Sequence, residues 1–183
     1  MNLPDKFLFS RYFLPACLLL IPAFAIAKIS DATQVLNIEA DSVEIREQQG
    51  ISIYKGNVTI SRGSMLIKGQ LIHITSKKNN EFDIKIEGEP ARFKQLNDSD
   101  QEVNAESEKM NFSSESGILT MNKKAILVQG ENRFTSEHII YNTKKDIVQA
   151  GKAEAASSTT KPERVSITIQ PKQKQKTTAD QPQ

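Results

Sequence analysis

Apolar and polar residues alternate along most of the middle of this chain, and this period of two constrains the fold more than any other feature. Phe82, Ile84 and Ile86 each alternate with a charged residue, and Val58 and Ile60 alternate with hydroxyl residues. Apolar stripes at helical spacing are hard to find. Alternation is typical of a strand with one buried and one solvated face. The sequence therefore predicts an all-β fold whose dry faces meet, as in a sandwich, jelly roll or flattened barrel.

A set of four landmarks occurs twice along the chain. The first set is Ala40-Asp41-Ser42, Gly50-Ile51, Gly63 and Gly88, and the second is Ala105-Glu106-Ser107, Gly117-Ile118, Gly130 and Gly151. The offsets between matching landmarks are 65, 67, 67 and 63 residues. Such landmarks are typical of turns and strand entries. They predict one antiparallel unit that continues lengthwise into a longer sheet, with an extended surface and no single obvious pocket.

The first residues have the pattern of a cleavable signal peptide. Lys6 and Arg11 precede an almost wholly apolar run from Phe13 to Ile26, and Ala27 closes a small-x-small cleavage signal. We expect cleavage after Ala27, so that Lys28 begins the mature chain. The apolar run is shorter than the roughly 20 residues that span a bilayer, and a retained membrane anchor is the alternative.

The single cysteine lies within this predicted signal peptide. Leu14-Pro15-Ala16-Cys17 loosely resembles a lipoprotein signal, but Cys17 lies inside the apolar run and not at its end. We interpret it as an ordinary signal-peptide residue, so the mature chain has no cysteine. An exported chain without disulfides fits a bacterial periplasmic protein better than a small extracellular module.

Length and charge indicate one domain without a nucleic-acid surface. We expect a single β domain over residues 28–171, followed by a basic, Gln-rich and disordered tail over residues 172–183. The formal net charge is +2 and the signs are interspersed, a pattern that does not suggest nucleic-acid binding.

Motifs for catalysis are missing from the sequence. His73 and His138 occupy matching places in the two sets of landmarks, but no histidine pair, cysteine cluster or Asp-rich loop accompanies them. We therefore expect no metal site, no cofactor and no catalytic residue. Asp41 and Glu106 recur as the acidic member of the repeat. A carboxylate pair for glycoside chemistry is conceivable, but turn hydrogen bonding or strand-end solvation is the favoured interpretation, which leaves a binding protein.

Several segments resemble a known family. Leu36-Asn37-Ile38-Glu39-Ala40-Asp41, Tyr54-Lys55-Gly56-Asn57-Val58 and Ile67-Lys68-Gly69 resemble the opening of the OstA-like domain. Gly88-Glu89-Pro90-Ala91-Arg92-Phe93 and the closing segment from Arg164 to Pro171 look more specifically like the LptA family of lipopolysaccharide transport proteins. The resemblance covers about residues 33 to 171.

This resemblance implies a twisted β-jelly roll, open at both ends, that works in the periplasm between the inner and outer membranes. It implies that the acyl chains of lipid A, the anchor of lipopolysaccharide, lie in the interior. Family positions that contact lipid fall on Leu36, Ile38, Phe93 and Phe112, and a further one falls on the small, polar Ser114. The second set of landmarks has Lys123-Lys124-Ala125 in place of Gly-Asn-Val, which we expect to alter the local register.

The resemblance also implies partners at both ends of the domain. Family members stack head to tail, with LptC at the N-terminal edge and the N-terminal domain of LptD at the C-terminal edge. We expect the terminal strand to pair with the first edge of the next domain by β-augmentation. The predicted assembly edges are Val35, Asn37, Val165, Ile167 and Ile169.

Three other readings remain open. One is a structural periplasmic scaffold whose interior is simply filled. Another is a relative of LptC that keeps its inner-membrane anchor, and the third is a periplasmic glycan-processing enzyme that uses Asp41 and Glu106.

Overall fold

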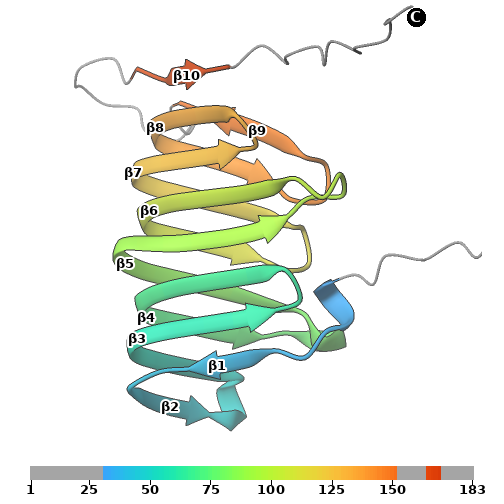
Figure 1. Cartoon of the computed structure of the whole chain (residues 1–183). Helices are drawn as coiled ribbons and strands as arrows, with labels where there is room; N and C mark the ends of the chain where they lie inside the picture. Colours follow the sequence, from blue (N-terminus) through green and yellow to red (C-terminus); the bar gives the residue numbers. More distant parts are fainter. Residues whose placement is uncertain (1–30, 152–163, 170–183) are drawn as a thin grey trace, which may run out of the picture.

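The computed structural model describes residues 31–151 and 164–169, so the expected signal peptide and tail lie outside the described residues. The described chain forms one antiparallel sheet of ten strands (Figure 1). The strands are β1 (Asn37–Glu39), β2 (Ser42–Arg46), β3 (Ile51–Arg62), β4 (Met65–Ser76), β5 (Phe82–Leu96), β6 (Glu102–Ser113), β7 (Ile118–Gln129), β8 (Asn132–Asn142), β9 (Ile147–Ala150) and β10 (Ser166–Thr168). Short 3-10 turns lie at Asp31–Thr33 (η1), Glu47–Gln49 (η2) and Lys78–Asn80 (η3).

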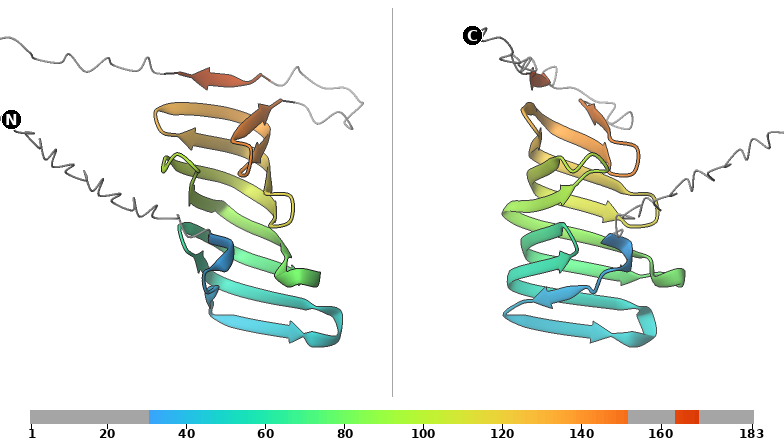
Figure 2. Two further views of the ribbon diagram at one scale, coloured as in Figure 1. Left: turned by 90° about the vertical axis from the view of Figure 1, so that its right-hand side faces the viewer. Right: turned by 45° about the vertical axis from the view of Figure 1, so that its right-hand side comes forward.

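The sheet folds over along one line, which we call the crease. The pairings among β3 to β8 each shift register near the middle of the strands, for example between Lys55 and Val58 and between Glu87 and Ala91. Because these shifts lie side by side, each long strand belongs to two half-sheets. The first half-sheet ends in β1 and β10, and the second ends in β2 and β9. The strands follow one another along the length of the molecule, and the sheet does not close into a barrel (Figure 2).

Unusual backbone conformations produce the crease. Gly56 and Asn57 have φ of 75° and 44°, and Lys123 and Lys124 have φ of 65° and 53°. The turn-like sequence around Gly56 is therefore a bulge inside β3 and not a connection between two strands. The register does shift at Lys123-Lys124, as expected, but equivalent shifts occur in the other strand pairs. A bulge that bends a strand does not require glycine.

The dry faces of the two half-sheets meet and form the core. In the first half-sheet, residues that pair across successive strands form one apolar row from end to end. This row is Ile38, Ile60, Ile67, Phe93, Ala105, Leu127, Phe134 and Ile167. A row from Val43 to Ala150 runs through Ile86 and Met121 in the second half-sheet. Directly paired residues share a face, so the core continues along the whole stack.

At the start of β3, alternation predicts the wrong inward-facing residues. Ile51 and Ile53 have the spacing of dry residues, but Tyr54 pairs with the buried Ile72 and therefore faces inward. Ile53 pairs with His73 on the outer face; it is only 9% exposed there, but it is not part of the core cluster between the half-sheets. The extra residues of the bulge at Gly56-Asn57 change which residues of β3 point inward.

The two sets of landmarks occupy equivalent places in the fold. Gly50 and Gly117 precede β3 and β7, and Gly63 and Gly130 form the tight turns after those strands. Asp41 contacts the crease at Asn57, and Ser107 lies at the crease in β6. The repeat therefore corresponds to two successive runs of strands, first β2 to β5 and then β6 to β9.

Candidate functional site

The interior between the half-sheets holds the aromatic residues that the sequence singled out. Phe93 lies on β5 in the first half-sheet and Phe112 lies on β6 in the second. They are 1% and 7% exposed, and their ring centroids are 5.4 Å apart. Leu36 and Ile38 are half-buried and pack against the same core at the N-terminal end. The four expected interior positions thus belong to one apolar interior.

This interior is packed in the described structure. Ile60, Ile67 and Leu127 have no exposed surface. Side chains at native density leave no room for an acyl chain without displacement. Within the described residues these side chains leave no open path along the axis, and space for a ligand must come from movement of the half-sheets or of their side chains.

The side of the molecule opposite the crease has an opening, which we call the mouth. There the turns that connect strands of the first half-sheet face those of the second. A hollow of about 550 Å³ lies in the mouth, with Met65, Phe82 and Phe112 among its lining residues and Arg62 and Lys144 among its charged ones. It combines apolar walls with charged groups, as an amphiphile requires.

Ser114 also lines this hollow. Its hydroxyl accepts a hydrogen bond from the Phe82 backbone N–H at 2.8 Å, and its own N–H donates to the Phe82 carbonyl at 3.0 Å. The small residue at this family position therefore holds two neighbouring turns together.

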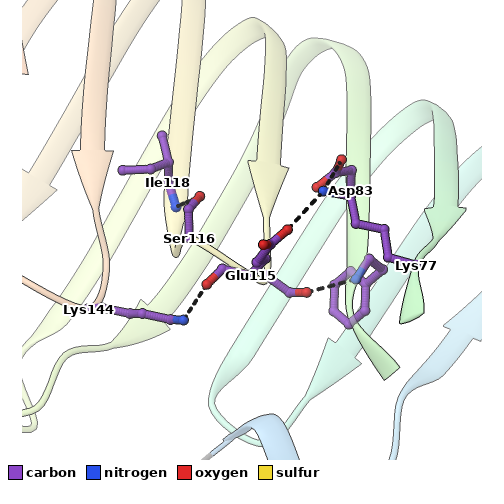
Figure 3. Close-up of polar contacts among 8 residues, drawn as sticks. Lys77, Asp83, Glu115, Ser116, Ile118 and Lys144 are labelled. Atoms are coloured by element: carbon purple, nitrogen blue, oxygen red, sulfur yellow. Dashed lines mark hydrogen bonds and ion pairs between the residues drawn. The ribbon is translucent and has the colours of Figure 1, made fainter. Parts of the chain in front are cut away.

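Ion pairs join the turns along the second half-sheet's side of the mouth (Figure 3). Lys77 Nζ lies 2.9 Å from Asp83 and 3.3 Å from Glu115, and Lys144 Nζ donates to the Glu115 carbonyl at 2.5 Å. Hydrogen bonds to Asp83 and Glu115 raise the pKa of Lys77. These exposed pairs run along the rim, so they stabilise its turns without linking the two half-sheets.

A second polar cluster, the Asp146 clasp, crosses the mouth. It consists of Asp146 in the β8–β9 turn, Tyr141 on β8, Gln129 at the end of β7 and Asn97 in the β5–β6 loop. The Asp146 carboxylate accepts hydrogen bonds from Tyr141 Oη at 2.8 Å, Gln129 Nε2 at 2.7 Å and Asn97 Nδ2 at 3.1 Å. Burial, and then the hydrogen bond to Asp146, raise the pKa of the Tyr141 phenol.

The N-terminal strap, residues 31–34, lies on the first half-sheet's side of the mouth, where Asp31 lines the hollow. Asp31 accepts hydrogen bonds from the Ser64 N–H at 2.8 Å, the Ser64 hydroxyl at 2.6 Å and Gln95 Nε2 at 3.1 Å. Arg62 Nε donates to the Gln34 carbonyl at 3.1 Å, and its guanidinium lies 5.4 Å from the centroid of the Phe82 ring. The hollow thus lies between the strap and the Asp146 clasp.

Both ends of the stack expose apolar side chains. Within the described residues, no further strand covers the outer edges of β1, β2, β9 and β10. Of the eight large hydrophobic side chains that are exposed in the described part of the chain, seven lie at these ends, and Leu96 lies at the mouth. The seven are Val35, Val43, Ile45, Ile147, Val165, Ile167 and Ile169.

Strand β10 pairs with β8 of its own chain. It carries Ile167, with Val165 and Ile169 on either side, and Asn37 begins β1 at the opposite end. The expected assembly edges are therefore the two ends of the first half-sheet. Sequence reasoning missed the matching ends of the second, β2 and β9, although Val43 and Ile45 alternate with charged residues as β1 does.

The carboxylates considered for glycoside chemistry do not form a catalytic pair. Asp41 accepts a hydrogen bond from Asn57 Nδ2 at 3.0 Å at the crease, whereas Glu106 pairs with Arg92 Nε at 3.0 Å on the outer face. Within residues 31–151 and 164–169, the histidines and acidic residues form no group that could hold a metal ion. The same residues include no helix long and apolar enough to cross a bilayer.

Comparison with known proteins places this arrangement in a family. Residues 37–147 match the model of the LptA/(LptD N-terminal domain) LPS transport protein family. The lipopolysaccharide export system protein LptH of Pseudomonas aeruginosa is 30% identical over 154 residues, which cover 83% of this chain and 88% of that protein. LptA of Haemophilus influenzae is 26% identical over 138 residues, or 74% of this chain and 80% of that protein.

A solved structure supports the same assignment. The crystal structure of LptH, described as the LptA homologous periplasmic component of the lipopolysaccharide transport device of P. aeruginosa, superposes with a TM-score of 0.70. It is 28% identical and covers 78% of this chain and 100% of that chain. The folded sheet is therefore the β-jelly roll that the resemblance implied, and the chain belongs to the LptA/(LptD N-terminal domain) family of lipopolysaccharide transport proteins.

Proposed function

We propose that this protein binds lipopolysaccharide in the periplasm and carries it from the inner to the outer membrane as part of a bridge. The observation that carries the proposal is the apolar row from Ile38 to Ile167, which reaches both open ends of the molecule. The names of the relatives, lipopolysaccharide export system proteins, agree with it. No catalytic step is needed for this role, and we expect none.

Lipopolysaccharide needs a carrier because its acyl chains are costly to expose to water. Exposing one acyl chain of twelve to fourteen carbons to water costs about 10 kcal/mol at about 0.8 kcal/mol for each methylene group. A lipid with several chains does not cross an aqueous space unaided. A continuous apolar interior supplies the necessary environment without any chemistry.

The exposed strand edges at the two ends of the stack are where we expect partner proteins to bind. We propose that copies of this chain stack head to tail, with an LptC-like protein on β1 and β2 and the N-terminal domain of an LptD-like protein on β9 and β10. The exposed Val43 and Ile147 support a junction that uses both half-sheets. Pairing of exposed strand edges is a common mode of recognition between β domains.

A photoreactive residue in the interior tests lipid binding. With such a residue at position 93 or 112, the mature chain should form a crosslink with lipopolysaccharide in cells that are making it. The control position is Arg92, which neighbours Phe93 but lies on the outer face and pairs with Glu106. Crosslinks of equal yield from positions 92 and 93 would contradict an interior site.

The packed interior supports a second candidate, a structural scaffold. Residues such as Ile60 and Leu127 are fully buried, as they would be in a chain with no ligand. Depletion of the protein in a Gram-negative host separates the two functions. A transport bridge requires newly made lipopolysaccharide to accumulate in the inner membrane, whereas normal delivery to the cell surface would favour the scaffold.

A further inference from the structure

The interior has no room for an acyl chain until the half-sheets or their side chains move, so the contacts that hold the mouth together bear on how a ligand could enter. Asp146 belongs to the second half-sheet, while its partners Asn97 and Gln129 belong to the first. Their hydrogen bonds cross the mouth at one end of the hollow. The ion pairs of Lys77 and the hydrogen bond from Lys144 to the Glu115 carbonyl, in contrast, stay on one side.

The Asn97 side chain is held in the orientation in which it binds Asp146. It is buried, and its Oδ1 accepts hydrogen bonds from the backbone N–H groups of Ser99 and Gln101 at 3.0 and 2.9 Å. These bonds fix the orientation of the amide, so that Nδ2 points across the mouth to Asp146. A buried side chain with this many partners has one well-defined arrangement.

Asp146 itself is placed by the β8–β9 turn. Asn142 Oδ1 accepts hydrogen bonds from the N–H groups of Lys144 and Lys145, both at 3.0 Å, and Asp146 has a φ of 55°. Asp146 is exposed, unlike Asn97. Water can therefore compete for its carboxylate, and the clasp can open without unfolding the strands on either side.

We propose that the Asp146 clasp controls access to the interior, and that its release lets the mouth widen so that an acyl chain enters from the side through the hollow between Phe82 and Phe112. This inference rests on the proposed lipid-binding function for the identity of the ligand. Asp146 acts here as a positioning residue: it sets the separation of the half-sheets and does not contact the lipid.

A covalent bridge across the mouth tests the proposal. The mature chain has no cysteine after the expected cleavage site, so Asn97→Cys with Asp146→Cys can be joined by a short bifunctional thiol reagent. The control is Arg92→Cys with Glu106→Cys, a directly paired couple of the neighbouring strands β5 and β6 on the outer face, away from the mouth. Fluorescently labelled lipopolysaccharide is the probe for loading.

The unbridged mouth pair should load lipopolysaccharide faster than the natural sequence, and the bridged form should load at least tenfold more slowly than the unbridged one. Bridging the control pair should leave its loading rate unchanged. Equal loading by the bridged and unbridged mouth pairs would overturn the proposal, as would equal slowing of the control. A role confined to stability predicts no loss of loading in the bridged form.

Hydrogen exchange supplies a readout without lipid. Asp146→Ala should raise amide exchange at least tenfold in the loop over residues 97–101 and the turn over residues 142–147, and leave the crease at Gly69 unchanged. If exchange responds in this way but no form binds lipopolysaccharide, the proposed function fails and the clasp stands. If the natural sequence binds lipopolysaccharide but exchange does not change, the clasp is wrong and the function stands.

Discussion

At the scale of single residues, Tyr141 shows how the interior and the mouth are joined. Its ring is buried in the core, while its hydroxyl reaches the Asp146 carboxylate. Burial together with this carboxylate raises the pKa of the phenol. The folded chain therefore holds the phenolic proton more tightly than the unfolded chain does.

This difference predicts a loss of stability in alkali. An unfolded tyrosine ionises near pH 10, so the folded state binds more protons above that pH and the free energy of unfolding falls as the pH rises, by up to about 1.4 kcal/mol per pH unit. Tyr141→Phe should remove this part of the fall, and should cost about 1.5–3 kcal/mol at pH 8 through the lost hydrogen bond. Urea unfolding at pH 8 and pH 11 measures both. The same alkaline fall in the variant would contradict the assignment.

Two glycines at equivalent turns allow the strap to be tested. Gly63 and Gly130 have φ of 58° and 55°, where alanine costs about 1–2 kcal/mol. A Cβ at Gly63 would lie 2.2 Å from Asp31 Oδ1, whereas a Cβ at Gly130 would meet the end of the Gln101 side chain at 2.6 Å. Gly63→Ala should therefore lower the free energy of unfolding by about 1 kcal/mol more than Gly130→Ala, because the Asp31 hydrogen bonds break as well. Equal losses in urea unfolding would show that the strap contributes nothing.

At the scale of elements, the crease is the feature that turns a row of strands into a jelly roll. Most of the strand content is predictable from alternation, as for Phe82, Ile84 and Ile86, which all face inward. Alternation alone does not predict which residues face inward on the far side of the crease. Gly56-Asn57 has the sequence of a turn but forms a bulge, and the shift between Glu106 and Lys109 has no glycine to mark it. Register depends on pairing with neighbouring strands, which a local pattern does not contain.

The crease in β7 is made from residues that disfavour its conformation, and this gives a prediction. Lys123 has a positive φ, and its Nζ lies a distant 3.8 Å from Glu108. Lys123→Gly should relieve the strain and raise the free energy of unfolding by about 0.5–1 kcal/mol. Lys85→Gly, in the regular part of β5, should instead lower it by about 0.5–1 kcal/mol. Thermal and urea unfolding compare the two, and a loss of stability in both variants would contradict the strain at the crease.

At the scale of the whole molecule, the apolar ends predict self-association. Ile167→Asp together with Ile169→Asp should weaken end-to-end assembly at least tenfold, because charges would enter the junction without partners. The control is Thr120→Asp, which lies on the outer face in the middle of the stack. Sedimentation over a range of concentrations measures association. Unchanged assembly of the double variant, with folding intact, would place the junction elsewhere.

The contacts across the mouth cannot be predicted from the sequence. Asn97 and Asp146 are separated by 49 positions, and each looks like an ordinary turn residue in the sequence. Their meeting depends on the half-sheets facing each other, which follows from the crease. The interior residues Phe93 and Phe112, in contrast, were predictable, because family resemblance singled them out and their strands alternate.

The direction of the end strands restricts how copies can join. Strand β1 runs from the mouth toward the crease, since Asn37 pairs with Ser61 and Glu39 with Thr59. Strand β10 runs the opposite way, since Ser166 pairs with Thr135 and Thr168 with Arg133. If the C-terminal end of one copy meets the N-terminal end of the next, β10 and β1 are antiparallel while both creases lie on the same side.

Two identical ends cannot meet in this way. Antiparallel pairing of β1 with a second β1 would put the two creases on opposite sides, and parallel pairing would turn one interior outward. A stack in which both half-sheets continue therefore has a single orientation throughout. Such a filament has two chemically different tips, so in the proposed bridge the inner and the outer membrane would each meet a different surface.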